Sequence, residues 1–174
     1  GVQKQFYADH NIPTAPFTLY DNANALKGAD ISYPIIQKMR TGGYDGKGVQ
    51  LLKTSSDSFD APNLCESLID FDKELSVIVA RNEDGDVQCF PSVECEFNPE
   101  ANLVEYLFSP ANISKEITQK ANSIAIDLIE KLGMIGLLAV EFFLCKNGDL
   151  LVNEIAPRPH NSGHHTLECC NTSQ

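Results

Sequence analysis

The stretch Asn153-Glu154-Ile155-Ala156-Pro157-Arg158-Pro159-His160-Asn161-Ser162-Gly163-His164 directly follows a short apolar run at residues 150–152. It brings a carboxylate, a guanidinium, imidazoles and amides together at the end of a predicted strand. Its two prolines fix the backbone and remove two N–H donors. Because loops on a rigid scaffold often carry binding and catalytic residues, we interpret this loop as a chemical site.

The segment just upstream predicts the partner strand of this stretch. Residues 137–145 are almost entirely apolar, which is typical of a buried strand, and Asn147-Gly148 is a type I′ hairpin signal. A two-residue turn pairs Lys146 with Asp149. Counting back along the ladder from that pair sets the register of the whole hairpin.

This register places Glu141 directly opposite Glu154. Opposed like charges destabilise a sheet, and burying them without a partner costs more. A divalent cation held between the two carboxylates would remove the conflict. Mg²⁺ suits such a pair, because it takes its remaining ligands from water and substrate phosphates. The alternative is that both glutamates face solvent at the rim of a sheet, where Glu is normally found; the apolar neighbours favour the metal site.

A lysine and a glycine-rich loop come earlier in the chain. Lys38 lies in a predicted strand at residues 33–40, and Thr41-Gly42-Gly43-Tyr44-Asp45-Gly46-Lys47-Gly48 joins it to a strand at residues 49–52. Glycine lets backbone N–H groups approach an anion closely, and Lys47 adds a positive charge. The loop is not a Walker A motif, which ends in G-K-[ST] and leads into a helix. We interpret it as a flap over phosphates; the alternative for Lys38 is an edge charge that prevents aggregation.

Composition limits the classes of protein. The chain has 174 residues, enough for one domain with a sizeable core, and 43% of them are hydrophobic. The net charge of −11 argues against a general nucleic-acid binder. The apolar runs are too short for a membrane span, and no signal-peptide pattern is present. Six cysteines without a C-x-x-C pair favour reduced, buried thiols in a cytosolic protein over disulfides or zinc: Cys65, Cys89, Cys95, Cys145, Cys169 and Cys170.

The rest of the chain predicts several strands and one long helix. Apolar residues recur at helical spacing from Ile113 to Leu132, with Ser114 as N-cap and Gly133 as the stop. Ser162 is a candidate N-cap for a second helix, and residues 70–73 are a polar link. Alternating strands and turns predict an antiparallel sheet. The remaining predicted elements are short helices at 3–10 and 22–28 and strands at 16–20, 64–69, 74–81, 87–97 and 103–108.

The order of these features resembles the ATP-grasp family. The strings at residues 42–48 and 153–164 resemble in particular those members that carboxylate an aminoimidazole ribonucleotide, and the likeness covers essentially the whole chain. It implies an α+β, ATP-grasp fold in which two α/β subdomains with largely antiparallel sheets grip ATP between them. Residues 1 to about 70, with the flap, would form the first subdomain, and about 71–174, with the metal and substrate loop, the second. In the full enzyme, further N- and C-terminal domains would flank this one, so the chain alone is expected to be inactive.

The resemblance also implies a role for each candidate residue. Lys38 would contact the ATP phosphates, and Glu74 would hold the ribose hydroxyls. Glu141 and Glu154 would carry Mg²⁺, or Mn²⁺ in its place. The loop residues Arg158, His160 and Asn161 would orient bicarbonate, carboxyphosphate and the imidazole substrate. The other cofactor-binding candidates are Gly43, Tyr44, Asp45, Gly46, Lys47 and Gly48 in the flap, Glu66, Ser67, Leu68 and Ile69 beside the adenine, and Asn153 next to the metal.

The activity that the resemblance implies is an ADP-forming carbon–nitrogen ligation in purine biosynthesis. Its small-molecule partners would be ATP, bicarbonate and aminoimidazole ribonucleotide, in a cytoplasmic, homodimeric enzyme that binds neither nucleic acid nor membrane. One alternative is a different ATP-grasp ligase, such as a formate-using purine enzyme or a biotin carboxylase. Another is a nucleotide-binding module without catalytic activity.

Overall fold

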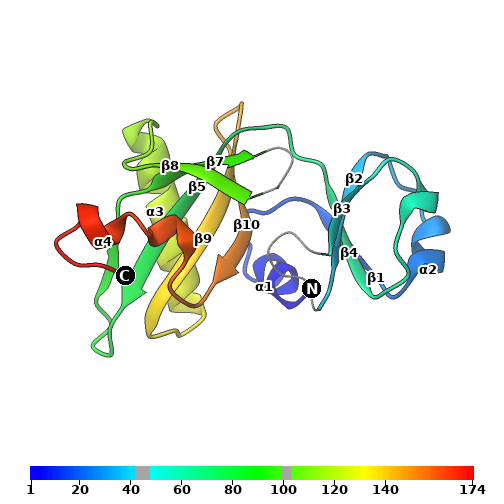
Figure 1. Cartoon of the computed structure of the whole chain (residues 1–174). Coiled ribbons are helices and arrows are strands. Elements are labelled where there is room, and N and C mark those ends of the chain that lie inside the picture. Colours follow the sequence, from blue (N-terminus) through cyan, green and yellow to red (C-terminus); the bar gives the residue numbers. More distant parts are fainter. Residues whose placement is uncertain (42–47, 99–102) are drawn as a thin grey trace. The chain divides into compact units, whose positions relative to one another are not determined.

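The computed structural model describes residues 1–41, 48–98 and 103–174. The chain divides into two compact units, Gly1–Ile69 and Asp70–Gln174, each with its own sheet (Figure 1). Within the described ranges every strand pair is antiparallel, and helices accompany both sheets. The α+β class and the antiparallel sheets expected from the sequence are therefore confirmed.

The first unit is a four-stranded sheet in the order β1-β4-β2-β3 with two flanking helices. Its strand β2 lies between β4 and β3, so it is an interior strand. Its elements are α1 (Val2–Asp9), β1 (Phe17–Tyr20), α2 (Ala23–Lys27), β2 (Ile35–Met39), β3 (Val49–Leu52), η1 (Ser55–Asp57) and β4 (Asn63–Ser67).

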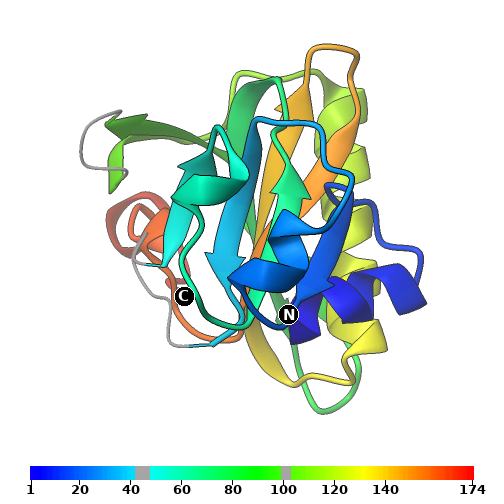
Figure 2. The same ribbon diagram turned by 90° about the vertical axis from the view of Figure 1, so that its right-hand side faces the viewer.

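One face of this sheet forms the unit's core. Leu26 of α2 packs with Ile35, Leu52 and Cys65, one from each of three neighbouring strands. Figure 2 views the unit from the side on which α2 lies. Because successive side chains of a strand alternate between faces, Lys38 points to the opposite face from Ile35. This alternation leaves the second face for polar groups.

The second unit is a six-stranded sheet in the order β10-β9-β5-β7-β8, with β6 paired to β5. The long central strands β5 and β9 pair along most of their length. Its elements are β5 (Phe71–Arg81), β6 (Val87–Cys89), β7 (Val93–Asn98), β8 (Leu103–Phe108), α3 (Lys115–Lys131), β9 (Gly136–Cys145), β10 (Leu150–Ala156), η2 (Asn161–Gly163) and α4 (Thr166–Cys169).

The helix α3 matches its sequence signals. The Ser114 side chain accepts a hydrogen bond from Ile117 N–H at 3.3 Å, and Gly133 follows the helix in the left-handed region with φ of 60°. Ala121, Ala125 and Leu128 are fully buried and face the sheet. With 17 residues α3 is the longest helix in the described ranges, and none there has both the length and the apolar character of a membrane span.

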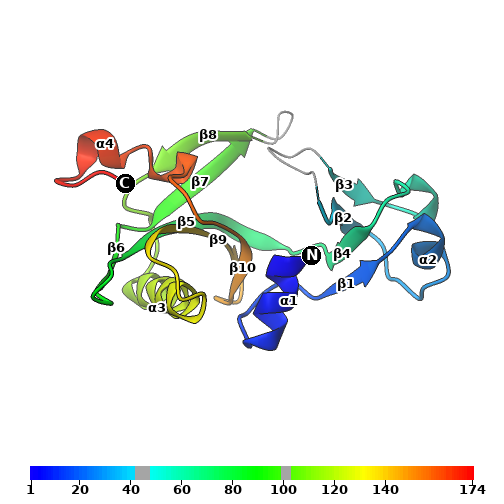
Figure 3. The same ribbon diagram turned by 90° about the horizontal axis from the view of Figure 1, so that it is seen from below.

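The two faces of the second sheet have different coverings. Figure 3 shows α3 on one side of β5 and β9 and the segment from η2 to α4 on the other. Val77 and Val140 pair across the strands and point to the helix side, where both are fully buried. Ser76 pairs with Glu141, so these two side chains share the opposite face. The second face therefore carries the polar groups.

Some predicted boundaries are wrong. Residues 71–73 belong to β5 rather than to a polar link. They pair with the end of β9, and the pairing register shifts by one residue between Phe71 and Lys73. The predicted strand at 87–97 is two strands, β6 and β7, which both pair with β5. The strand predicted at 64–69 ends at Ser67.

Candidate functional site

The hairpin β9–β10 turns through three residues, not two. Cys145 N–H donates to Asp149 C=O at 2.8 Å, and Gly148 N–H donates to Cys145 C=O at 2.9 Å. Gly148 adopts φ of 85°, which glycine reaches without steric cost. The predicted pairing of Lys146 with Asp149 is therefore wrong by one residue at the turn.

A β-bulge at Asn153 corrects this one-residue offset before β10 reaches Glu154. Leu150 pairs with Leu144 and Val152 with Phe142, and the register then shifts so that Glu154 pairs with Glu141. Val152 is fully buried, whereas Glu154, two positions later, is exposed and lies opposite Glu141. In a regular strand the two would share a face. The extra residue thus lets Val152 face the core and Glu154 face the site.

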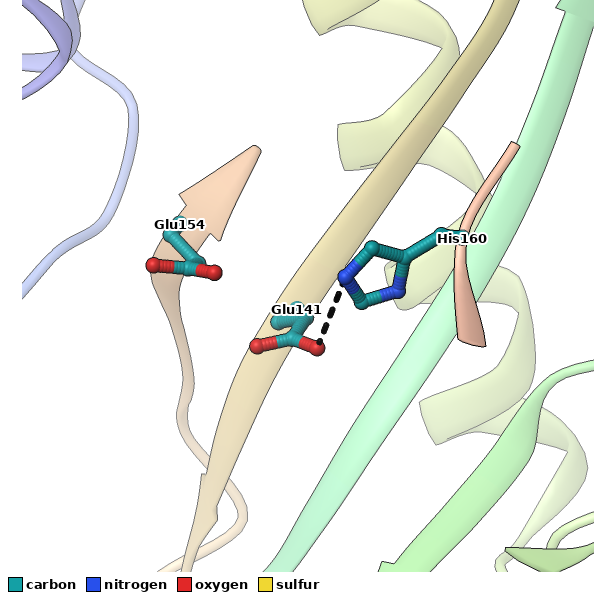
Figure 4. Close-up of side chains that lie close together, drawn as sticks. All are labelled: Glu141, Glu154 and His160. Carbon is teal, nitrogen blue, oxygen red and sulfur yellow. Dashed lines mark ion pairs between the residues drawn. The ribbon is translucent and has the colours of Figure 1, made fainter. Parts of the chain in front are cut away.

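Glu141, Glu154 and His160 form one cluster (Figure 4). One ligand atom from each lies within 4.8 Å of those of the other two, and His160 Nε2 lies 3.7 Å from Glu141 Oε1. The Glu141 side chain is only 16% exposed, while Glu154 lies on β10, which ends the sheet. The prediction that the two glutamates face each other is confirmed. The solvent-rim alternative fits Glu154 but not Glu141.

A chain of hydroxyl groups holds the imidazole of His160. Ser162 Oγ lies 2.9 Å from His160 Nδ1 and 2.8 Å from Ser76 Oγ of β5. Ser162 N–H also donates to Nδ1, at 3.4 Å, so the network makes Nδ1 an acceptor. An imidazole that accepts at Nδ1 carries its proton on Nε2 when neutral. In this arrangement the N–H bond of Nε2 faces Glu141.

The electrostatic environment favours the neutral imidazole. Burial is the main cause that lowers the pKa of His160, and the nearby Arg158 and His164 lower it further. The prediction that Ser162 caps a longer helix is wrong, because His160 caps η2 and Ser162 is fully buried within it.

The donor set of the cluster fits a hard divalent cation. Two carboxylates on neighbouring strands are the ligands that Mg²⁺ or Mn²⁺ takes from a protein. His160 Nε2 lies 3.7 Å from Glu141 Oε1, outside hydrogen-bond range, and an imidazole nitrogen suits such a cation less well than the two carboxylates do. Glu141 and Glu154 are therefore the residues of this cluster that could hold such a cation, with His160 beside them.

The other loop residues lie at the surface of this unit. Arg158 is exposed, and its Nη1 donates to the carbonyl of Pro159 at 3.0 Å. Asn161 is exposed at the start of η2.

Two further candidate residues of this unit lie on strands. Asn153 occupies the bulge beside Glu154. Glu74 pairs with Phe143 two positions from the Ser76–Glu141 pair, so it projects from the same face as Glu141.

In the first unit a buried carboxylate joins two lysines. Lys38 Nζ lies 3.2 Å from Glu66 Oε2, and Lys4 Nζ of α1 lies 3.2 Å from Glu66 Oε1. The Lys4 contact is an ion pair without hydrogen-bond geometry. Glu66 and Lys4 side chains are 3% and 6% exposed, and that of Lys38 is 25% exposed. Since β2 is an interior strand, the edge-charge alternative for Lys38 is wrong.

Three of the remaining predicted cofactor-binding residues directly follow Glu66 in the chain. Ser67 and Leu68 are exposed at the end of β4, and Ile69 is partly buried. Gly48 adopts φ of 78°, and its carbonyl accepts from Met39 N–H at 2.8 Å. The flap residues Gly43, Tyr44, Asp45, Gly46 and Lys47 lie outside the described ranges.

Sequence reasoning missed Lys4 and Ser76. Lys4 precedes Tyr7 by three positions on α1, and both are buried. That spacing is the signal that could have placed the lysine on an inward face. Ser76 meets Ser162 across 86 positions, a contact that strand alternation alone does not predict.

Known proteins match this chain over nearly its whole length. The sequence profile of the ATP-grasp domain matches residues 5–174. The N5-carboxyaminoimidazole ribonucleotide synthase of Bacillus subtilis is 42% identical over 182 residues, which cover 99% of this chain and 47% of that protein. The chain therefore spans about half the length of this relative.

Solved structures agree with the sequence match. The crystal structure of an ADP complex of N5-carboxyaminoimidazole ribonucleotide synthetase superimposes with a TM-score of 0.88 at 37% identity, covering 98% of this chain and 47% of that one. The Aspergillus clavatus enzyme in complex with ADP and 5-aminoimidazole ribonucleotide gives a TM-score of 0.81 at 28% identity, with 98% and 47% coverage.

Proposed function

Because the chain belongs to the ATP-grasp family, we propose that it is the ATP-grasp domain of an enzyme that makes 5-(carboxyamino)imidazole ribonucleotide from 5-aminoimidazole ribonucleotide, ATP and bicarbonate. The observation that carries the proposal is the pair Glu141 and Glu154 beside the buried His160. A solved relative holds ADP and 5-aminoimidazole ribonucleotide, which are a product and a substrate of this reaction.

The first unit supplies phosphate-binding groups. Lys38 contacts the ATP phosphates, and the flap at residues 42–48 covers them. Since Glu66 already has Lys4 as a second cationic neighbour, Lys38 can turn toward a phosphate while Glu66 stays compensated. Residues 66–69 lie beside the adenine, and Glu74 of the second unit holds the ribose hydroxyls.

In the second unit Glu141 and Glu154 would hold the metal that accompanies ATP, with Asn153 beside them. When bound, Mg²⁺ or Mn²⁺ neutralises charge on the phosphate oxygens during transfer. Glu141 also lies 3.7 Å from His160 Nε2, so the imidazole stands beside the carboxylate pair.

The chemistry has two steps. An oxygen of bicarbonate attacks the γ-phosphorus of ATP, the bond to the β-phosphate oxygen breaks, and carboxyphosphate and ADP form. The amine of the ribonucleotide then attacks the carboxyl carbon, and inorganic phosphate and a proton leave. Arg158 suits a planar anion such as bicarbonate, since its fork makes two parallel hydrogen bonds. His160 and Asn161 orient the intermediate and the imidazole substrate, and a closed flap excludes water, which would hydrolyse the acyl phosphate.

Substrate-dependent ATP turnover tests the proposal. The full-length enzyme should release ADP and phosphate only when bicarbonate and 5-aminoimidazole ribonucleotide are both present, and the 174-residue chain alone should form no product. Turnover with another acceptor would favour a different ATP-grasp ligase, and ATP binding without turnover would favour a non-catalytic module. Either result would overturn the proposal. It includes a cytoplasmic location and a homodimer for the full-length enzyme, which rest on family resemblance.

A further inference from the structure

Gln174, in the second unit, holds the loop that carries His160. The carboxamide Oε1 of Gln174 accepts from His160 N–H at 3.0 Å, and its Nε2 donates to His160 C=O at 2.8 Å. One side chain thus engages both backbone groups of one residue. Two hydrogen bonds to the same residue fix the direction of its backbone as well as its position.

The Gln174 side chain is anchored in turn. Gln174 N–H donates to Thr166 Oγ1 at 3.1 Å, and the Thr166 hydroxyl donates to Gly163 C=O at 2.7 Å. Thr166 is fully buried. These bonds join the two ends of the segment 160–174 around one buried threonine.

Gly163 leaves the space that the Gln174 carboxamide occupies. A Cβ atom on Gly163 would collide with Gln174 Oε1 and would lie 2.5 Å from its Cδ. These atoms are the end of a flexible side chain, so an alanine at 163 would displace the carboxamide rather than break the loop. The glycine is therefore matched to this glutamine.

We propose that Gln174 is a positioning residue, which clamps the His160 backbone so that the imidazole is held against Glu141. Two restraints act on His160: Gln174 fixes its backbone, and Ser162 fixes its ring at Nδ1. With only the second restraint, the ring could rotate together with the loop and lose its approach to Glu141. The effect of these hydrogen bonds on catalysis rests on the proposed function, whereas the hydrogen bonds themselves do not.

Amide hydrogen exchange on the 174-residue chain tests the clamp directly. Gln174→Ala should raise the exchange rate of the His160 amide by at least about tenfold, because the amide loses its acceptor. Gln174→Glu keeps the acceptor for the His160 N–H but loses the donor to the His160 carbonyl, so it should preserve only part of the protection. Gly163→Ala should reproduce the effect of Gln174→Ala by displacing the carboxamide. The amides of Val140 and Phe142 in β9 should be unchanged in all three variants.

The reference amides separate positioning from general stability. If Gln174→Ala accelerates His160 and the β9 amides in parallel, the residue only stabilises the fold and the proposal is overturned. An unchanged His160 amide in Gly163→Ala would overturn it as well, even if Gln174→Ala failed to fold. The double variant should match either single one, because the methyl group has no carboxamide left to displace. Additive effects would contradict the clamp.

Steady-state kinetics of the full-length enzyme give the catalytic consequence. A misplaced group in an active site costs up to roughly a hundredfold in rate, so Gln174→Ala should lower kcat by roughly tenfold to a hundredfold. The KM for ATP should stay within about twofold, and Gln174→Glu should recover part of kcat. A rise in KM for ATP that matches the fall in kcat would overturn the positioning role. Absence of carboxylation by the wild type would instead overturn the proposed function, and hydrogen exchange would still decide the clamp.

Discussion

The two units of the chain surround their carboxylates with groups of opposite kind. In the first unit one glutamate, Glu66, lies between the ammonium groups of Lys4 and Lys38. In the second unit two glutamates, Glu141 and Glu154, face each other beside an imidazole whose burial disfavours a positive charge. The first cluster therefore carries a net positive charge, and the second a net negative one.

This difference shows which ligand each cluster is suited to. A cluster with excess ammonium groups attracts an anion such as a phosphate, and a cluster with excess carboxylates attracts a cation. In the first cluster both oxygens of the buried Glu66 carboxylate have an ammonium neighbour, so its charge is compensated. In the second cluster the two opposed carboxylates repel each other, and a cation between them would remove that repulsion. Five substitutions test this contrast, from the largest expected effect to the smallest.

Glu66→Gln should have the largest effect on stability. It leaves the nearly buried ammonium of Lys4 without its charged neighbour, and breaking a buried ion pair in this way costs about 3 to 5 kcal/mol. Urea unfolding of the 174-residue chain measures the loss. Asp70→Asn, which removes the exposed partner of Lys146, should be indistinguishable from wild type. A loss in Glu66→Gln no larger than in this control would show that the first cluster is not compensated by its own charges.

Replacing each lysine by methionine separates their roles. Lys4→Met should destabilise the chain by about 2 kcal/mol, since a charged contact to a buried carboxylate is lost while Lys38 remains. Lys38→Met should cost less, because its side chain is 25% exposed and that of Lys4 only 6%. Nucleotide binding, measured by calorimetry, should be lost in Lys38→Met and kept in Lys4→Met. If Lys38→Met destabilised the chain more than Lys4→Met, the roles assigned to the two lysines would be exchanged. The same would follow if Lys4→Met, and not Lys38→Met, lost nucleotide binding.

Glu154→Gln should abolish the response of the second cluster to metal. At a Mg²⁺ concentration of roughly ten times Kd, a wild-type site gains about 1.4 kcal/mol by mass action. The variant should lose this gain, yet melt slightly higher than wild type without metal, because the repulsion with Glu141 is relieved. Glu130→Gln on the exposed side of α3 is the matched control. Thermal melts with and without Mg²⁺ decide the matter, and a Mg²⁺-dependent shift that persists in Glu154→Gln refutes the metal assignment.

Ser76→Ala should have the smallest effect. It removes one neutral hydrogen bond to Ser162, worth about 1 kcal/mol, and leaves both glutamates untouched. Ser123→Ala on the exposed side of α3 serves as the control. Urea unfolding should rank Ser76→Ala well below Glu66→Gln. A loss as large as that of Glu66→Gln would mean that neutral hydroxyls, and not charges, dominate the energetics of these sites.

Local sequence signals predicted the elements well, and long-range contacts account for what they missed. Helix α3 followed from apolar spacing and its two end signals, because both are local. The pairing of Glu141 with Glu154 was right, although the predicted turn was too short, because the bulge at Asn153 cancels the error. The contacts of Lys4 with Glu66 and of Ser76 with Ser162 span many residues, and no pattern of period two or 3.6 encodes them.

The bulge at Asn153 has a consequence for aligning relatives of this chain. Since Asn153 is the extra residue of β10, deleting it alone would leave Val152 opposite Phe142 and Glu154 opposite Glu141. Deleting Leu151 instead would turn Val152 away from the core. A one-residue gap at Asn153 in a homologue is therefore compatible with an intact pair of glutamates, whereas the same gap two positions earlier indicates that the strand has been rebuilt.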